Sequence, residues 1–116
     1  MITLYHYPRC STCVKARKWL ESQGVTFTAI DLASAPPSKA ELITIHTLSN
    51  KPIKALFNTS GQSYRRGGFK DRLPEMSEDN QFEALAADGM LIKRPIAVGD
   101  GFALIGFKQA EWEEAL

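Results

Sequence analysis

The stretch ITLYHYPRCSTC, residues 2–13, decides the fold. Threonine and tyrosine alternate with isoleucine, leucine and histidine along residues 2–7, and this alternation predicts a β-strand. Pro8 ends the strand because proline has no backbone N–H to donate. Residues 11–23 then carry apolar side chains at helical spacing, and Gly24 follows where a helix commonly ends. The stretch therefore predicts a strand that leads directly into a helix, with two cysteines where they meet.

The chain that follows completes a β-α-β unit and then becomes helical. Residues 25–29 alternate between apolar residues and threonine, which predicts a second strand that lies parallel to the first after a right-handed crossover. Ser38 and Glu41 form the pattern of a capping box and begin a helix. Several helices are expected over about residues 38–89, interrupted by a loop at residues 59–68.

A hairpin and a last helix complete the sequence. Gly99-Asp100-Gly101 separates two apolar runs, residues 96–98 and 102–105, and a glycine-rich turn in this setting predicts a β-hairpin. Residues 111–116 are typical of an amphipathic helix. The order is therefore β-α-β, several helices, and β-β-α. We expect an α/β fold in which helices flank a four-stranded mixed sheet.

Length and charge narrow the classes of function. The chain of 116 residues fits a single domain over residues 1–116, and 44% of its residues are hydrophobic and can form a core. Its 14 Lys and Arg nearly balance its 13 Asp and Glu, so the composition gives no electrostatic case for direct binding of nucleic acid. No run approaches the ~18 apolar residues of a membrane helix. The first residues lack the features of a signal peptide, and we expect a cytoplasmic protein with no membrane partner.

Both cysteines of the chain, Cys10 and Cys13, lie in one C-x-x-C motif. A disulfide across two residues closes almost no loop and adds little stability, so the pair is interpreted as reactive. Cys10 lies at the predicted start of a helix, where unpaired N–H groups and the helix dipole favour a thiolate. Arg9 adds a cation or points into solvent. Cys13, one turn later, is placed to resolve a mixed disulfide formed at Cys10.

Two alternatives to a reactive dithiol remain open: a pair of inert thiols on an amphipathic helix, and a metal site. His6 and His46 do not have the spacing of zinc ligands, and no metal is expected. His6 on the first strand is interpreted as a hydrogen-bonded structural residue rather than a catalytic base. The basic segment over residues 64–72 is interpreted as a solvated loop, with an anion-binding or partner-binding patch as the alternative.

Five short motifs resemble those of the ArsC/Spx family. HYPRC at residues 6–10 and DGMLIKRPI at residues 88–96 carry most of the resemblance, with PPS at 36–38 and IGF at 105–107 extending it along the chain. FNTSG at residues 57–61 makes the sequence most similar to the YusI-like branch of the family.

This resemblance implies a thioredoxin fold with a helical insertion at about residues 38–89. It implies that Pro95 is cis beside the Cys10 loop, and that Arg94 points toward the thiolate or a bound oxyanion. Cys10, Cys13 and Arg94 are then the candidate catalytic residues. The candidate binding residues around them are His6, Arg9, Ser11, Thr12, Asn58 and Pro95. No bound cofactor is expected, and electrons would come from thioredoxin or from a glutathione or glutaredoxin system.

The family resemblance implies two kinds of function. Arsenate reductases of the family hold the oxyanion with three arginines, of which Arg94 matches one while Asn58 stands at the position of another. Spx regulators use the same C-x-x-C as a redox switch and bind the α subunit of RNA polymerase, with a glycine at the contact where this chain has Pro52. We therefore expect a thiol-disulfide oxidoreductase or arsenate reductase-like enzyme, with an Spx-like redox-sensing regulator as the alternative.

Overall fold

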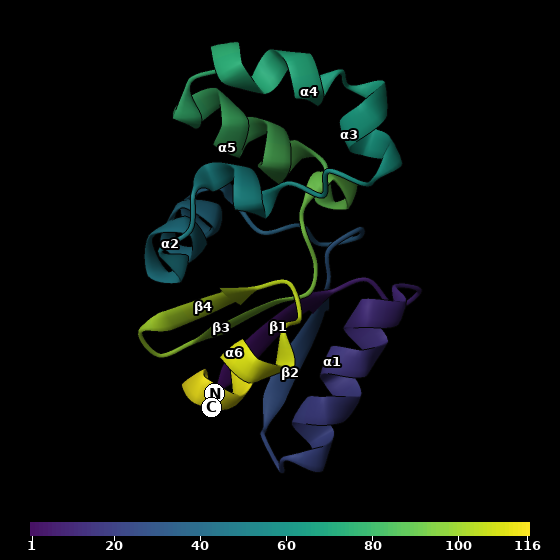
Figure 1. Cartoon of the computed structure of the whole chain (residues 1–116), viewed down its shortest axis with the longest axis vertical. Helices are drawn as coiled ribbons and strands as arrows, with labels where there is room; N and C mark the ends of the chain where they lie inside the picture. The colour runs from purple at the N-terminus through teal and green to yellow at the C-terminus, as the bar shows by residue number, and fades with distance from the viewer.

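A four-stranded mixed sheet forms the centre of the computed structural model, which describes all residues 1–116 (Figure 1). The strand order is β2-β1-β3-β4. β1 (Ile2–His6) pairs in parallel with β2 (Phe27–Asp31) and antiparallel with β3 (Ile96–Gly99). β4 (Phe102–Ile105) pairs antiparallel with β3 across the hairpin. This arrangement confirms the expected fold class.

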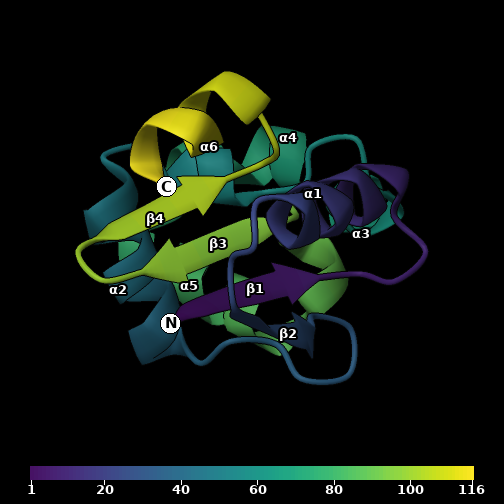
Figure 2. The same ribbon diagram turned by 90° about the horizontal axis from the view of Figure 1, so that it is seen from below.

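Helices cover both faces of the sheet. The α-helices are α1 (Ser11–Ser22), α2 (Lys39–Ser49), α3 (Gln62–Arg66), α4 (Phe69–Arg72), α5 (Glu78–Ala87) and α6 (Gln109–Ala115). Short 3-10 turns lie at η1 (Ile53–Leu56), η2 (Leu73–Glu75) and η3 (Gly89–Leu91). Helices α1 and α6 lie on one face, and α2 to α5 lie on the other (Figure 2). No helix has both the length and the apolar character needed to cross a membrane.

The alternation of side chains along β1 divides the interior into two apolar clusters. Leu4 points toward α1 and α6, where it packs in a cluster with Leu20 and Trp112. Tyr5 points to the opposite face and belongs to the larger cluster under the insertion helices, with Leu42 among its members. Successive residues of a strand face opposite sides of the sheet, so one short strand organises both cores.

Local signals in the sequence account for most of these elements. The capping box is present: the Glu41 backbone N–H donates to Ser38 Oγ at 3.1 Å, and the Ser38 N–H donates to Glu41 Oε1 at 3.0 Å. The predicted second strand lies two residues further along than expected, because its register against β1 pairs Ile2 with Phe27 and His6 with Asp31.

The loop predicted at residues 59–68 is wrong over residues 62–66, where α3 forms. Tyr64 is 7% exposed and its ring packs against Phe57 and Phe69, with ring centroids 6.4 and 6.0 Å away. The glycines on either side of this short helix suggested a loop. Burial of the tyrosine across the insertion stabilises a helical turn that local propensity alone does not.

Two backbone contacts join the insertion to the segment that precedes β3. An isolated antiparallel bridge pairs Phe57 with Ile92, flanked by hydrogen bonds from Asn58 N to Leu91 O at 2.8 Å and from Lys93 N to Leu56 O at 2.7 Å. This short ladder places residue 58 next to the chain that leads to Arg94.

Candidate active site

Cys10 is the N-cap residue of α1. After β1 ends, the chain turns so that the Cys10 N–H donates to Tyr7 O at 3.0 Å, and Cys10 takes an extended backbone conformation with φ −82° and ψ 120°. Its Sγ accepts a hydrogen bond from the backbone N–H of Cys13 at 3.4 Å. The sulfur therefore takes the place that a serine or aspartate oxygen fills at other helix starts.

Competing effects set the pKa of Cys10. Partial burial of the thiol raises the pKa, but hydrogen bonds from the Cys13 N–H, the Cys13 side chain and the Thr12 N–H, together with the charge of Arg94, lower it more. The net result is a pKa below the usual value of a cysteine. Because the thiolate is the nucleophilic form, Cys10 is the activated sulfur of the pair.

Cys13 has the opposite electrostatic environment. Its side chain has no exposed surface, and burial raises the pKa of its thiol to about 12. The hydrogen bond to the Cys10 sulfur and the charge there add to the rise, while a backbone hydrogen bond from Tyr7 and the charge of Arg94 oppose it. Both thiols are free in this structure. Cys13 therefore remains a protonated thiol while Cys10 ionises.

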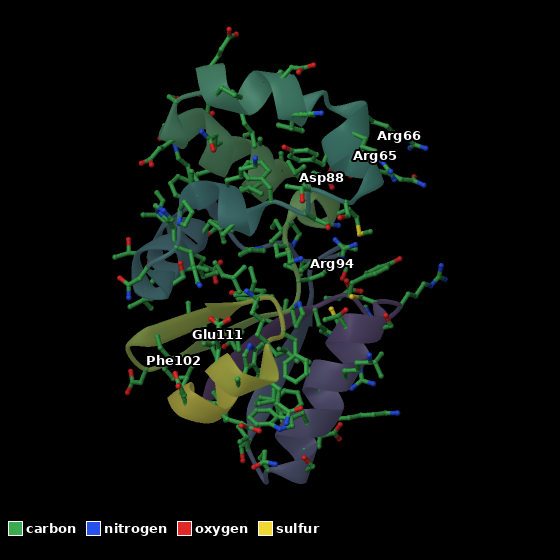
Figure 3. All side chains as sticks on the ribbon, in the orientation of Figure 1. Arg65, Arg66, Asp88, Arg94, Phe102 and Glu111 are labelled. Atoms are coloured by element: carbon green, nitrogen blue, oxygen red, sulfur yellow. The ribbon has the colours of Figure 1, made fainter.

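Arg94 lies between the insertion helices and the start of α1 (Figure 3). Its Nη1 donates to Met90 O at 3.1 Å and to Ile92 O at 3.3 Å. Its guanidinium lies over the Tyr7 ring, 5.5 Å from the centroid. The peptide bond between Arg94 and Pro95 is cis, and Pro95 is buried. These contacts hold the arginine where its charge acts on both thiols.

Asn58 meets Arg94 from the insertion side. With its amide oxygen toward the guanidinium, Asn58 accepts hydrogen bonds from Nη1 at 3.2 Å and Nη2 at 3.3 Å. Gly61 leaves space for this amide, because a Cβ at position 61 would lie 2.6 Å from the terminal atom of the Asn58 amide group that faces Arg94. The short ladder between residues 56–58 and 91–93 fixes the backbone on both sides of the contact.

The remaining candidate residues divide into exposed and buried. Arg9, Ser11 and Thr12 are exposed around the Cys10 loop. Arg9 is not among the groups that shift the pKa of Cys10. His6 is 8% exposed, and its Nδ1 has no hydrogen-bond partner, so the expected hydrogen-bonded role is wrong for that nitrogen. Burial lowers the pKa of His6, and the charge of Arg17 lowers it further against the opposing effect of Asp31.

The arginines of the basic segment over residues 64–72 have two kinds of environment: one makes contacts within the segment, and two extend into solvent. Arg72 donates to Gly67 O at 2.8 Å and lies over the Phe69 ring. Arg65 and Arg66 are exposed and extend outward from α3 in Figure 3, where with Arg94 they border a cavity of about 420 Å³. No group of three or more His, Cys, Asp or Glu side chains is placed to hold a metal ion.

Two features of the site were not found from the sequence. Tyr7 supplies an aromatic face for Arg94, and the signal was the tyrosine in HYPRC next to the cysteine loop. Arg94 also borders a second cavity, which is lined by several lysines. These lysines come from segments distant in the sequence, so the sequence does not bring them to notice as a group.

The strand order, the cis bond before Pro95 and the dithiol at the start of α1 define a thioredoxin-fold protein with a C-x-x-C site. Residues 5–115 match the ArsC family. The chain belongs to the ArsC family.

Three relatives show the range of the family that this chain resembles. It is 48% identical over 113 residues to the uncharacterized protein YusI of Bacillus subtilis, covering 97% of this chain and 96% of YusI. It is 41% identical to the structure of a possible arsenate reductase from Streptococcus mutans, with a TM-score of 0.92 and coverage of 100% and 98%. It is 28% identical to the global transcriptional regulator Spx of Streptococcus agalactiae, covering 96% of this chain and 80% of the regulator.

Proposed function

We propose that this protein is a thiol-disulfide oxidoreductase in which Cys10 is the nucleophile and Cys13 the resolving thiol. The observation that carries the proposal is the opposite direction of the two pKa shifts within one C-x-x-C: the pKa of Cys10 is lowered, and that of Cys13 is raised to about 12. Two inert thiols would not be expected to differ in this way across one helical turn.

The reaction is a pair of disulfide exchanges. The Cys10 thiolate attacks one sulfur of a substrate disulfide, forms a Cys10–substrate disulfide and releases the first substrate thiolate. The Cys13 thiol gives up its proton to a leaving thiolate or to water, and its sulfur attacks Cys10, which releases the second substrate thiol. The Cys10–Cys13 disulfide is then reduced by an external dithiol, for which we propose a protein of the thioredoxin or glutaredoxin type.

Arg94 stabilises the negative charge on Cys10, and Asn58 positions Arg94. The same contacts favour a disulfide over arsenate as the substrate. A doubly charged oxyanion needs several charge-assisted hydrogen bonds. Arg94 already donates to Met90, Ile92 and Asn58, and Asn58 cannot supply the second positive charge.

A trapping experiment tests this proposal. The Cys13→Ser variant cannot resolve a mixed disulfide at Cys10. Incubation with a small disulfide should therefore leave one half of the substrate covalently attached to Cys10. Mass spectrometry should show this as an added mass that a reductant removes. The wild-type protein should instead end as the internal disulfide with no added mass, and Cys10→Ser should acquire no adduct. An unmodified Cys13→Ser protein, or equal adducts on both single variants, would overturn the assignment of roles.

A second candidate function is suggested by the likeness to Spx: a redox-switched regulator that binds the α subunit of RNA polymerase. Both thiols are free in this structure, so a disulfide would bring the two sulfurs to ~2.05 Å from each other and disturb the hydrogen bond from the Cys13 N–H to Cys10 Sγ at the start of α1. Pull-down with the isolated C-terminal domain of that polymerase subunit, using oxidised and reduced protein, tests the idea. Binding that depends on redox state supports the regulator, and absence of binding in both states rejects it.

A further inference from the structure

A groove of about 420 Å³ borders the first turn of α1, the helix that begins directly after the reactive cysteine. Thr12, two residues after Cys10, lines one part of the groove, and Arg94 lines another. Residues 51–59 around η1 and residues 105–111 from the end of β4 into α6 supply most of the remaining lining, with Lys93 beside Arg94. Grooves of ~300–1,000 Å³ are the size that small ligands and short peptide segments occupy.

The groove is strongly basic although the whole chain is nearly neutral. Its lining contains five cations and one acid, which are Lys51, Lys54, Lys93, Arg94, Lys108 and Glu111. The whole chain has 14 Lys and Arg against 13 Asp and Glu. The fold therefore gathers these cations from separate segments, and a cleft lined by one sign of charge raises the local concentration of ligands of the opposite sign.

Three of the cations have no acidic partner. Glu111 lies 3.7 Å from Lys51 and 3.9 Å from Lys108, so its charge is shared between them. Lys54, Lys93 and Arg94 take part in none of the ion pairs of the structure. Lys54 and Lys93 are exposed and free to meet a carboxylate of a ligand.

A glycine and apolar side chains also line the groove. Gly106 has a φ of 73°, a conformation that favours glycine. A Cβ there would lie 3.4 Å from Lys93 Cε, so the lysine stem extends across the glycine. The half-buried side chains of Ile105 and Phe107 add apolar surface to the lining. A ligand with both apolar and acidic groups therefore finds complementary partners.

We propose that this groove binds an acidic peptide segment whose cysteine supplies the disulfide that Cys10 attacks. The inference rests on the proposed function and names its substrate class. Lys54 and Lys93 pair with carboxylates on residues that flank the substrate cysteine, while the substrate sulfur lies at the Cys10 end of the groove. In the exchange, one Cys10–peptide disulfide forms as one peptide thiolate leaves.

A charge series of peptide disulfides tests the groove. The probes are the symmetric disulfides of three acetylated, amidated peptides, with the sequences Glu-Glu-Cys-Glu, Gln-Gln-Cys-Gln and Lys-Lys-Cys-Lys. The Cys13→Ser protein is mixed with each, and the rate of adduct formation at Cys10 is followed by mass spectrometry. We expect the acidic peptide to react about tenfold faster than the neutral one, at the low end of the ~10–10³-fold range of electrostatic steering. The lysine peptide should react most slowly.

Lysine variants distinguish an effect of the groove on the reaction rate from an effect of the overall charge of the protein. Lys54→Gln combined with Lys93→Gln, in the Cys13→Ser background, should bring the ratio of acidic to neutral rates close to one. Lys18→Gln combined with Lys70→Gln removes the same charge from exposed positions outside the groove and should keep the original ratio. Added salt should lower the acidic rate far more than the neutral rate, because exposed charges are screened.

The outcomes distinguish the two proposals. Equal rates for the three peptides, or the same loss of ratio in both double variants, would overturn the groove assignment and leave the dithiol chemistry in place. No adduct with any of the peptides would instead remove the oxidoreductase function on which the inference rests.

Discussion

The side-chain amide of Asn58 meets the guanidinium of Arg94 across the junction between the helical insertion and β3, with its oxygen 3.2 and 3.3 Å from the two Nη atoms. Arg94 in turn lowers the pKa of Cys10. A residue of the insertion therefore acts on the reactive sulfur through one intermediate side chain. This gives the insertion a direct part in the chemistry of a site that otherwise belongs to the sheet and α1.

We predict that Asn58→Ala slows thiol-disulfide exchange, because an Arg94 that loses this acceptor no longer stays in place. Because Asn58 acts through the charge of Arg94, which contributes ~1 kcal/mol, a decrease of at most about fivefold is expected. The midpoint of the Cys10 pH profile should also rise, which a purely structural role would not produce. Stopped-flow exchange with a small disulfide measures both quantities.

Gly61→Ala should reproduce the effect of Asn58→Ala, because a Cβ at residue 61 would displace the Asn58 amide. The double variant should be no slower than either single variant, since both remove the same contact to Arg94. Effects that simply add would show that Gly61 and Asn58 act independently.

We predict different alkylation profiles for the two cysteines. In Cys13→Ser, the reaction of Cys10 with iodoacetamide should rise with a midpoint below the ~8.5 of an ordinary thiol, because the N–H groups of α1 and the charge of Arg94 stabilise the thiolate. In Cys10→Ser, Cys13 should be nearly inert at neutral pH, since burial raises its pKa. Two profiles with the same midpoint would contradict the division of roles.

We predict that Arg94→Gln raises the pKa of Cys10 and slows exchange about fivefold, the effect of losing ~1 kcal/mol of charge interaction. Arg94→Lys should lie between this variant and the wild type, because it keeps the charge and loses the forked contacts to Met90 and Ile92. Rates measured from acid to alkaline pH test this order. If Arg94→Lys is as slow as Arg94→Gln, placement of the donors rather than charge is the decisive property.

We predict that Gly89→Ala is strongly destabilising. A Cβ at Gly89 would lie 1.8 Å from the carbonyl oxygen of Leu32, so backbone must move where η3 meets the end of β2. Overpacking of this kind costs ~1–3 kcal/mol, and contact with backbone places the expected value near the upper end. Gly24→Ala is the control: its φ of 71° carries only the ~1–2 kcal/mol of a left-handed conformation, and its Cβ meets no atom. Urea unfolding should rank the two.

We predict that Tyr5→Phe lowers stability by ~1 kcal/mol at neutral pH, because the tyrosine hydroxyl donates to Glu41 Oε2 at 2.9 Å and the exposed position of the carboxylate limits the effect. The backbone N–H of Ser38, and then this hydroxyl, lower the pKa of Glu41. A lowered pKa in the folded state stabilises the protein above the ordinary value of ~4.3, and the benefit is lost as the pH falls through the folded pKa.

Tyr5→Phe should therefore show a weaker loss of stability on acidification than the wild type, since its Glu41 titrates closer to the ordinary value. Thermal unfolding at several acidic pH values measures the slope. Parallel curves for the two proteins would show that the hydroxyl does not act on this carboxylate.

Local signals made most of the fold predictable. The strand–helix junction at the cysteines, the capping box at Ser38 and the hairpin at residues 99–101 each depend on neighbouring residues, and each is confirmed. α3 was missed because its stability comes from Tyr64 packing against aromatic residues of other segments. The displacement of the second strand has a similar cause, since register is set by the partner strand.

The candidate site was predictable in its parts but not in its contacts. Cys10, Cys13 and Arg94 are brought together by the fold, and the pKa shift of Cys10 follows from its place at a helix start. The contact between Asn58 and Arg94 joins two segments far apart in the sequence, which are held together by one isolated β-bridge. No periodicity in the sequence reveals this pairing. The basic groove was not predicted for the same reason, because its two unpaired lysines, Lys54 and Lys93, come from segments far apart in the sequence.

The burial of Cys13 one turn behind Cys10 has a consequence for the protein under peroxide stress. An exposed low-pKa thiolate that meets peroxide becomes a sulfenic acid, and further oxidation to the sulfinic acid is irreversible in most proteins. Here a second thiol lies adjacent within the same helix start and can condense with the sulfenic acid, forming a disulfide and releasing water. The buried Cys13 thiol thus diverts Cys10 from irreversible oxidation to a disulfide, which a dithiol can reduce.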